Sequence, residues 1–174
     1  MLQRIIARML RVVKLDHTVW GEIEADETAN TEAVAIVVVA YLLSALGAAL
    51  APWLGGSVLA RFFVTLILGV GLLWLLWAYV TMLVGTRLFG GETTFAEMAR
   101  TLGYANAPRV LGILSAITCL GAIIGFVAWI LSLVAGFFAV RESLDLPTDK
   151  SIITMVISGV PVWVLYSLVM AVIF

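Results

Sequence analysis

Residues 90–114 read GGETTFAEMARTLGYANAPRVLGIL and form the one long polar interruption between two strongly apolar blocks of the chain. Thr94 and Glu97 fit the capping-box pattern, in which each side chain bonds the backbone of the other residue at the start of a helix. Phe95 and Met98 share one face of that helix, opposite polar side chains. We therefore expect a short amphipathic helix over residues 94–102.

The residues after this helix predict a turn into the next apolar segment. Gly103 stands where a glycine often ends a helix. Asn106 and Pro108 suit the first turn of a new helix, because asparagine caps free N–H groups and proline lacks only an N–H that would be unpaired there. Residues 103–109 are thus expected to form an elbow.

On both sides of this stretch the chain is apolar enough to cross a membrane. The sequence is 63% hydrophobic and 12% charged, against roughly half and a quarter in soluble domains. Residues 33–60, 62–86, 110–140 and 151–174 contain no charged residue, and about 20 apolar residues span a bilayer. The sequence predicts an all-α polytopic membrane helical bundle, with the helix over 94–102 lying at the membrane interface.

The run over residues 110–140 is too long for one crossing. As a single helix it would reach about 46 Å, against a bilayer core of about 30 Å. A hairpin turning near residues 119–121 gives five transmembrane helices, N-terminus inside and C-terminus outside. This topology puts most basic residues on the cytosolic side: Arg4, Arg8, Arg11, Lys14, Arg87, Arg100, Arg109, Arg141 and Lys150. One long helix with a re-entrant part is the alternative.

This topology divides the chain into two parts. Residues 1–30 form a cytosolic segment, and residues 31–174 form a membrane domain. The expected spans are residues 33–54, 62–85, 107–119, 122–140 and 152–174.

The cytosolic segment has a basic half and an acidic half. Residues 1–15 predict an amphipathic interfacial helix, with basic side chains that contact lipid, including anionic lipid: Arg4, Arg8, Arg11 and Lys14. Residues 16–32 read as a solvated acidic lead-in or as a docking surface for a cytosolic partner. The candidate partner-binding residues there are Glu22, Glu24, Asp26 and Glu27.

Residues 121–136 carry two small-xxx-small patterns that let membrane helices approach closely. These are Gly121 with Gly125, and Ser132 with Gly136. Packing within the molecule is the first interpretation, and association into a homo-oligomer is the second.

The sequence carries no pattern for catalysis or for a cofactor. We find no charge deep in a predicted span, no phosphate-binding loop and no metal motif, and the chain has one histidine and one cysteine, His17 and Cys119. A net charge of −1 predicts no nucleic-acid partner. We therefore expect a protein that is not an enzyme and has neither cofactor nor metal.

Residues 92–114 resemble the cytosolic loop and third span of the Yip-domain family, the Ypt/Rab-interacting membrane proteins. The likeness is carried by Phe95, by the run from Arg100 to Ala105 (RTLGYA) and by Pro108; the lead-in over residues 20–26 (WGEIEAD) is also similar. The resemblance extends from about residue 19 to the end and implies five spans with a cytosolic N-terminus. Eukaryotic members act in vesicle traffic and bind prenylated Rab GTPases.

The short loops and the lack of a long N-terminal region look like prokaryotic members, which implies a prokaryotic plasma membrane. The resemblance supports a non-enzymatic membrane adaptor or organising protein, with elbow positions as partner-binding candidates: Gly103, Tyr104, Pro108 and Arg109. Two alternatives stay open. One is a stabilising subunit of another membrane complex. The other is a channel or transporter for a neutral solute, lined by Tyr41, Ser44, Thr65, Tyr79, Thr81, Ser115, Thr118, Ser158 and Tyr166.

Overall fold

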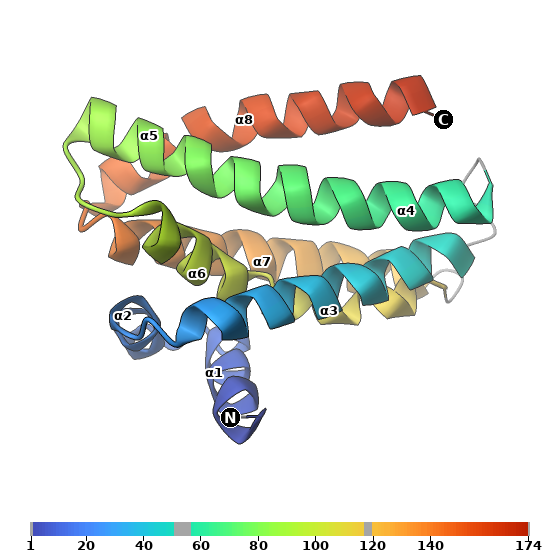
Figure 1. The fold of residues 1–174 in the computed structure, drawn as a ribbon, viewed down its shortest axis with the longest axis horizontal. Coiled ribbons are helices and arrows are strands. Elements are labelled where there is room, and N and C mark those ends of the chain that lie inside the picture. Colours follow the sequence, from blue (N-terminus) through green and yellow to red (C-terminus); the bar gives the residue numbers. More distant parts are fainter. Residues whose placement is uncertain (1, 51–56, 117–119, 174) are drawn as a thin grey trace.

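The computed structural model describes residues 2–50, 57–116 and 120–173, and every regular element within them is a helix (Figure 1). In chain order the elements are α1 Leu2–Val13, α2 Thr18–Ala25, α3 Ala29–Leu50, α4 Val58–Leu68, η1 Gly69–Leu76, α5 Trp77–Phe89, α6 Phe95–Ala105, η2 Ala107–Ala116, α7 Leu120–Ser143 and α8 Thr148–Ile173. The predicted all-α bundle is confirmed.

Among the described residues, four long helical segments run along the main axis of the bundle (Figure 1). They are long and apolar enough to cross a membrane: Ala29–Leu50, Val58–Phe89, Ile123–Ser143 and Thr148–Ile173. The second of these joins α4, η1 and α5, and its centre has π-helical hydrogen bonding. Large apolar side chains cover its outside and that of α8, for example Ile67 and Val172. Such an exterior suits lipid rather than water.

The capping box that opens α6 is present as predicted. The Glu97 backbone N–H donates to Thr94 Oγ1 at 3.3 Å, and the Thr94 N–H donates to Glu97 Oε2 at 2.7 Å. The end of the helix differs from the prediction, because α6 continues through Gly103 to Ala105. Asn106 closes α6 by donating its side-chain amide to the Leu102 carbonyl at 2.8 Å.

The expected position of this helix at the membrane surface is wrong. Residues 98–105 are buried among the other helices. A Cβ atom on Gly103 would lie 2.7 Å from the Cβ of Ala33. The glycine thus allows α6 and α3 to approach closely, which explains its presence inside the helix rather than at its end.

α6 and η2 follow one another between α3 and α7 (Figure 1). η2 is a 3₁₀ helix of ten residues, which rises about 20 Å at 2 Å per residue. The predicted third span over 107–119 is therefore too short to cross a bilayer core alone, and η2 prolongs the path that α6 begins. The predicted turn at residues 119–121 falls partly on 117–119, which lie outside the described residues; η2 and α7 on either side pack together.

The N-terminal segment is more structured than predicted. α1 confirms the helix expected over residues 1–15, but residues 16–32 do not form a solvated lead-in. α2 lies there and buries Val19, Trp20 and Ile23, whose spacing gives it an apolar face. α3 then begins at Ala29, so that Glu32 belongs to its first turn.

Candidate functional site

The N-terminal helices form a polar cap on one end of the bundle, which we define as residues 2–28 (Figure 1). We call this end the cap end; the α5–α6 loop and the α7–α8 loop lie there as well, and the C-terminus lies at the opposite end. α1 lies across the long axis of the bundle beside the start of α3. Val12 on α1 is buried, and Ile5 and Met9 pack against the core. The cap is therefore attached by apolar contacts as well as by polar ones.

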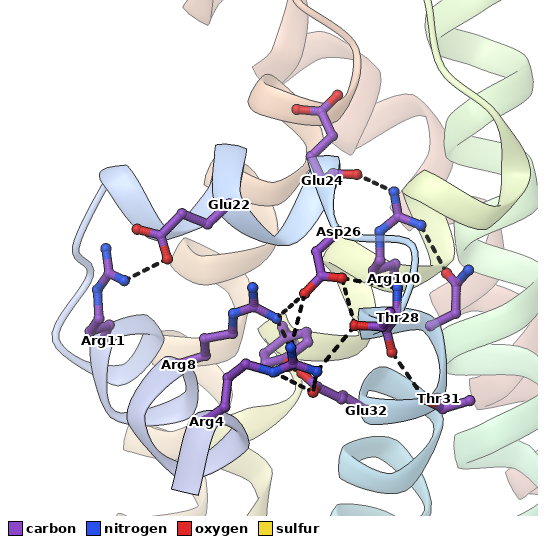
Figure 2. Close-up of polar contacts among 12 residues, drawn as sticks. Arg4, Arg8, Arg11, Glu22, Glu24, Asp26, Thr28, Thr31, Glu32 and Arg100 are labelled. Atoms are coloured by element: carbon purple, nitrogen blue, oxygen red, sulfur yellow. Dashed lines mark hydrogen bonds and ion pairs between the residues drawn. The ribbon is translucent and has the colours of Figure 1, made fainter. Parts of the chain in front are cut away.

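The polar attachment converges on the carboxylate of Glu32, whose side chain is 0% exposed. Arg4 Nε donates to Glu32 Oε1 at 2.8 Å, and Arg4 Nη2 pairs with the same oxygen. Arg8 Nη1 donates to Glu32 Oε2 at 3.2 Å, and the Tyr104 hydroxyl donates to that oxygen too. We call Arg4, Arg8, Asp26, Glu32 and Tyr104 the Glu32 network; all but Tyr104 are labelled in Figure 2.

Local chemistry explains how each element supplies its part of the Glu32 network. Arg4 and Arg8 are one helical turn apart on α1 and so point to the same side. Glu32 lies in the first turn of α3, where the N-terminal end of the helix dipole favours a negative charge. The network thereby joins α1, α3 and α6, three elements that no local sequence pattern connects.

Asp26 joins two parts of the cap, helix α1 and the turn that follows α2. Its carboxylate accepts from Arg8 Nη1 at 2.8 Å and from the backbone N–H of Thr28 at 3.0 Å. The hydrogen bonds from Thr28 and Arg8 lower the pKa of the Asp26 carboxyl to about 2. Asp26 is therefore ionised at neutral pH and fixes the turn between α2 and α3 against α1.

A second, more exposed group lies at the other end of α1. Arg11 Nε donates to Asp16 at 2.8 Å, and Arg11 Nη1 donates to Glu22 at 2.8 Å. Hydrogen bonds from Arg11 and Thr18 lower the pKa of Asp16 to about 2. Arg4, Arg8 and Arg11, which we expected to contact lipid, thus have carboxylate partners within the protein, whereas Lys14 is exposed. Lipid contact by these four residues stays a prediction.

Arg100 ties α6 to the link between α2 and α3. Its Nη1 donates to Asn30 Oδ1 at 3.0 Å, and its Nη2 donates to the backbone carbonyl of Glu24 (Figure 2). The side chain is buried. Because it bonds the backbone of α2, Arg100 holds the cap against α6.

Another part of the cap end is an acidic patch, which we define as Glu24, Glu97, Glu142 and Asp145. Burial, together with the charges of Asp145, Glu142 and Glu97, raises the pKa of the Glu24 carboxyl to about 7. These carboxylates form no ion pair among the described residues. The predicted partner-binding acids are therefore divided: Glu22 and Asp26 pair with arginines, Glu24 belongs to the patch, and Glu27 is exposed.

The elbow residues lie inside the bundle rather than on its surface. Gly103 packs against Ala33, Tyr104 is fully buried in the Glu32 network, and Pro108 is buried in η2. Arg109 points into the bundle, where its Cζ atom lies 5.6 Å from the ring centroid of Tyr41. η2 thus carries this charge between α3 and α7, and the absence of charge deep in a span stays a prediction.

The predicted packing positions on α7 differ from one another. A Cβ atom on Gly136 would lie 3.2 Å from the Trp77 ring, so the Trp77 side chain of α5 packs against α7 there. Gly125 has nothing within 4 Å of such an atom. Gly121 and Ser132 are buried, and Ser132 Oγ has no hydrogen-bond partner. Their role in packing stays a prediction.

Glu32 and Arg100 are not among the site residues predicted from the sequence. Glu32 directly precedes the charge-free run at residue 33, and Arg4 and Arg8 have the spacing of two ligands for one anion. That combination was a usable signal. Among the described residues, no group of three or more histidine, cysteine or acidic side chains is placed to hold a metal ion.

A bundle of long apolar helices with most of its charges gathered at one end is the architecture of a polytopic membrane protein. A family model, the Yip1 domain, matches residues 16–172, and the chain belongs to the Yip1 domain family. The resemblance seen in the sequence is thus confirmed over most of the chain. A search of curated proteins and a search of solved structures each found no match. The matched region begins at Asp16, so α1 lies outside it although α1 supplies Arg4 and Arg8 to the Glu32 network.

Proposed function

We propose that this Yip1-family chain is a non-enzymatic membrane adaptor with its interaction surface at the cap end, on the cytosolic side of a prokaryotic plasma membrane. The observation that carries the proposal is the Glu32 network. A buried carboxylate bonded by two arginines and a tyrosine holds the first two helices as a fixed cap, rather than as a loose tail. A fixed surface suits recognition, since less conformational freedom is lost when a partner binds.

The proposed topology has five crossings, with the N-terminus inside and the C-terminus outside. In this arrangement α6 and η2 together make the third crossing, and the boundary between residues 1–30 and 31–174 separates the cytosolic segment from the membrane domain. Its support is the charge distribution, since cytosolic loops are rich in lysine and arginine. Elements at the cap end carry Arg4, Arg8, Arg11, Lys14, Arg87, Arg141 and Lys150, whereas Arg61 begins α4 at the opposite end.

The cap end offers two surfaces of different chemistry. Leu2, Ile6, Leu10 and Val13 form an exposed apolar stripe on α1, and a helix that lies across the bundle axis suits the plane of the membrane interface. Together with Lys14, this stripe is our proposed lipid-contact surface. The acidic patch and the exposed Glu27 are our proposed surface for a basic segment of a cytosolic protein, because charge complementarity steers such encounters.

Labelling of single cysteines tests the topology. In a Cys119→Ser background, Thr93→Cys lies in the α5–α6 loop and Ser57→Cys lies at the start of α4. A membrane-impermeant maleimide added to intact cells of a bacterial host should label Ser57→Cys, and it should label Thr93→Cys only in inverted vesicles. The reverse pattern would overturn the proposed orientation.

A charge exchange tests the adaptor role. Arg8→Asp should detach α1 and reduce recovery of cross-linked cytosolic proteins from native membranes, because Arg8 loses both carboxylate partners. Arg8→Asp combined with Asp26→Arg restores opposite charges between positions 8 and 26 but sets a second carboxylate beside Glu32, so it should restore recovery only in part. Asp149→Lys, an exposed change on α8 outside the cap, is the control. If the Arg8 variant recovers the same proteins in the same amounts as the unchanged chain, the cap is not the interaction surface.

The channel alternative predicts that polar span residues share one internal face. Thr81 Oγ1 instead donates to Ser158 Oγ at 2.9 Å in a buried contact, and Tyr79 is 47% exposed beside Phe95. Thr118 lies outside the described residues. The positions of Thr81, Ser158 and Tyr79 favour a role in helix packing over the lining of a shared path. The adaptor is therefore the function to test first.

A further inference from the structure

A groove opens between the helices, and its lining is almost wholly apolar. It has a volume of about 680 Å³, within the range typical of small-molecule sites. Leu73 of η1, Trp77 of α5 and residues of α7 and α8 form its walls. Trp129 and Trp163 line it and are 40% and 60% exposed, so the groove is open on the outer surface of the bundle.

One charged side chain, that of Arg109, contributes to this lining. Its Nε atom is buried and has no hydrogen-bond partner, and the side chain forms no ion pair in the described part of the chain. Its Cζ atom lies 5.6 Å from the ring centroid of Tyr41, a favourable cation–π contact. The hydroxyl of Tyr41 is itself buried without a partner. Two neighbouring polar groups therefore lack partners beside an apolar groove.

The position of Arg109 makes this arrangement unusual. The Ser44 hydroxyl donates to the Arg109 carbonyl at 3.2 Å, which places Arg109 beside the second half of α3. Tyr41 lies about 18 Å along α3 from Ala29, at 1.5 Å per residue. Cationic side chains at such depth in a membrane protein pair with other groups and mark binding sites or pathways.

We propose that this groove binds a single-chain fatty acid, with the carboxylate paired to Arg109 and the hydrocarbon chain lying along Trp77, Phe137 and Trp163. An arginine fork matches a carboxylate geometrically, and the pair would satisfy the guanidinium. The tryptophan and phenylalanine walls match a hydrocarbon chain. This inference concerns the groove and does not depend on the adaptor proposal.

The depth of Arg109 selects a fatty acid over a bilayer phospholipid. The headgroup of a phospholipid lies at the interface, and its phosphate would have to move far into the apolar core to reach Arg109. A carboxylic acid can cross that region as the neutral acid, because burial favours its protonated form, and it can ionise beside the guanidinium.

Native mass spectrometry of the full chain in detergent tests the proposal, with stearate as the probe. We expect one stearate per chain at saturation, and much weaker binding of octadecanol, which has the same chain without a carboxylate. Arg109→Gln should weaken stearate binding about tenfold, the effect expected from losing one charge-assisted contact. Arg109→Lys keeps the charge and should bind within about threefold of the unchanged chain.

Further variants separate the groove from other sites. Gly159 lines the groove, so Gly159→Leu should block stearate binding while Arg109 remains. Arg87→Gln removes an exposed arginine at the cap end and should change nothing. The melting temperature of each variant identifies any that misfold.

Three results would overturn the proposal. The first is equal binding of stearate and octadecanol. The second is stearate binding that survives both Arg109→Gln and Gly159→Leu. The third is preference for a two-chain lipid such as phosphatidylglycerol, or a dimer that Gly159→Leu abolishes, either of which assigns the groove to a different occupant.

Discussion

Arginines occur in this protein in two opposite settings. In the cap, Arg8 contacts Asp26 at 2.8 Å and Glu32 at 3.2 Å, so that two carboxylates balance its charge. Beside the groove, Arg109 has an aromatic neighbour but no carboxylate within ion-pair distance among the described residues. A buried charge with hydrogen-bonded partners resists removal, whereas an unpaired one costs stability until something binds it. The difference is the basis of both proposals, the cap as a fixed interaction surface and the groove as a binding site.

The largest expected effect on stability comes from removing the charge at the centre of the Glu32 network. Glu32→Gln leaves Arg4, Arg8 and Tyr104 around a neutral amide, and it should lower the free energy of unfolding by about 2–4 kcal/mol. Thermal unfolding in detergent measures this change. Glu27→Gln is the matched control, since Glu27 is exposed and has no side-chain partner in the part of the chain described; it should stay within about 0.5 kcal/mol. Equal melting temperatures for the two variants would refute a structural role of the network.

The contact between α6 and α3 connects the Glu32 network with Arg109. Disrupting this contact should lower the free energy of unfolding by nearly as much. Gly103→Ala places a Cβ atom 2.7 Å from that of Ala33 and must push α6 away from α3. The shift moves Tyr104 from Glu32 and Arg109 from Tyr41, at a cost of about 1–3 kcal/mol. Gly71→Ala meets nothing within 4 Å and serves as the control. A Gly103→Ala protein as stable as the control would mean that this close contact is not required.

Matched substitutions of the two arginines test the comparison directly. Arg8→Met should destabilise the protein by about 1–3 kcal/mol, because Asp26 and Glu32 lose a shared partner. Arg109→Met should leave stability unchanged or raise it by about 1 kcal/mol, since it removes an unpaired charge from an apolar setting. Chemical or thermal unfolding of both variants measures whether each substitution lowers or raises the stability. If both were destabilised alike, Arg109 would have a partner within the protein.

The smallest expected effect is the pH dependence of the acidic patch. The pKa of Glu24 is about 7 in the folded protein, above its ordinary value of 4.5. Between pH 4.5 and 7 the folded protein keeps the proton on Glu24, whereas the unfolded chain releases it. The stability that this carboxyl group gives at low pH is therefore lost as the pH rises through 7. The melting temperature should therefore fall modestly from pH 5 to pH 8, and Glu24→Gln should flatten this slope. An unchanged slope in the variant would assign the pH dependence to other groups.

Several features were predictable because they depend on neighbours in the chain. The Thr94–Glu97 capping box, helix α1 and the long apolar helices all follow from spacing and composition over short distances. The Yip1 family resemblance was readable for the same reason, since its motif lies within residues 92–114. What was predicted wrongly also has a local cause: α6 has the amphipathic pattern of a surface helix, and only its neighbours show that both of its faces are covered.

The sequence by itself determined an all-helical membrane protein with a charged N-terminal segment, because hydrophobicity and capping are local properties. The tertiary structure decided which charges meet. Tyr104 and Glu32 are 72 residues apart, and Arg100 and Glu24 are 76 apart. The local pattern predicts that Gly103 ends a helix, whereas packing puts it inside α6 against Ala33. The charge pattern predicts that Arg109 is a cytosolic charge, whereas η2 carries it beside the groove. Contacts across such separations depend on how helices pack, which no local pattern encodes.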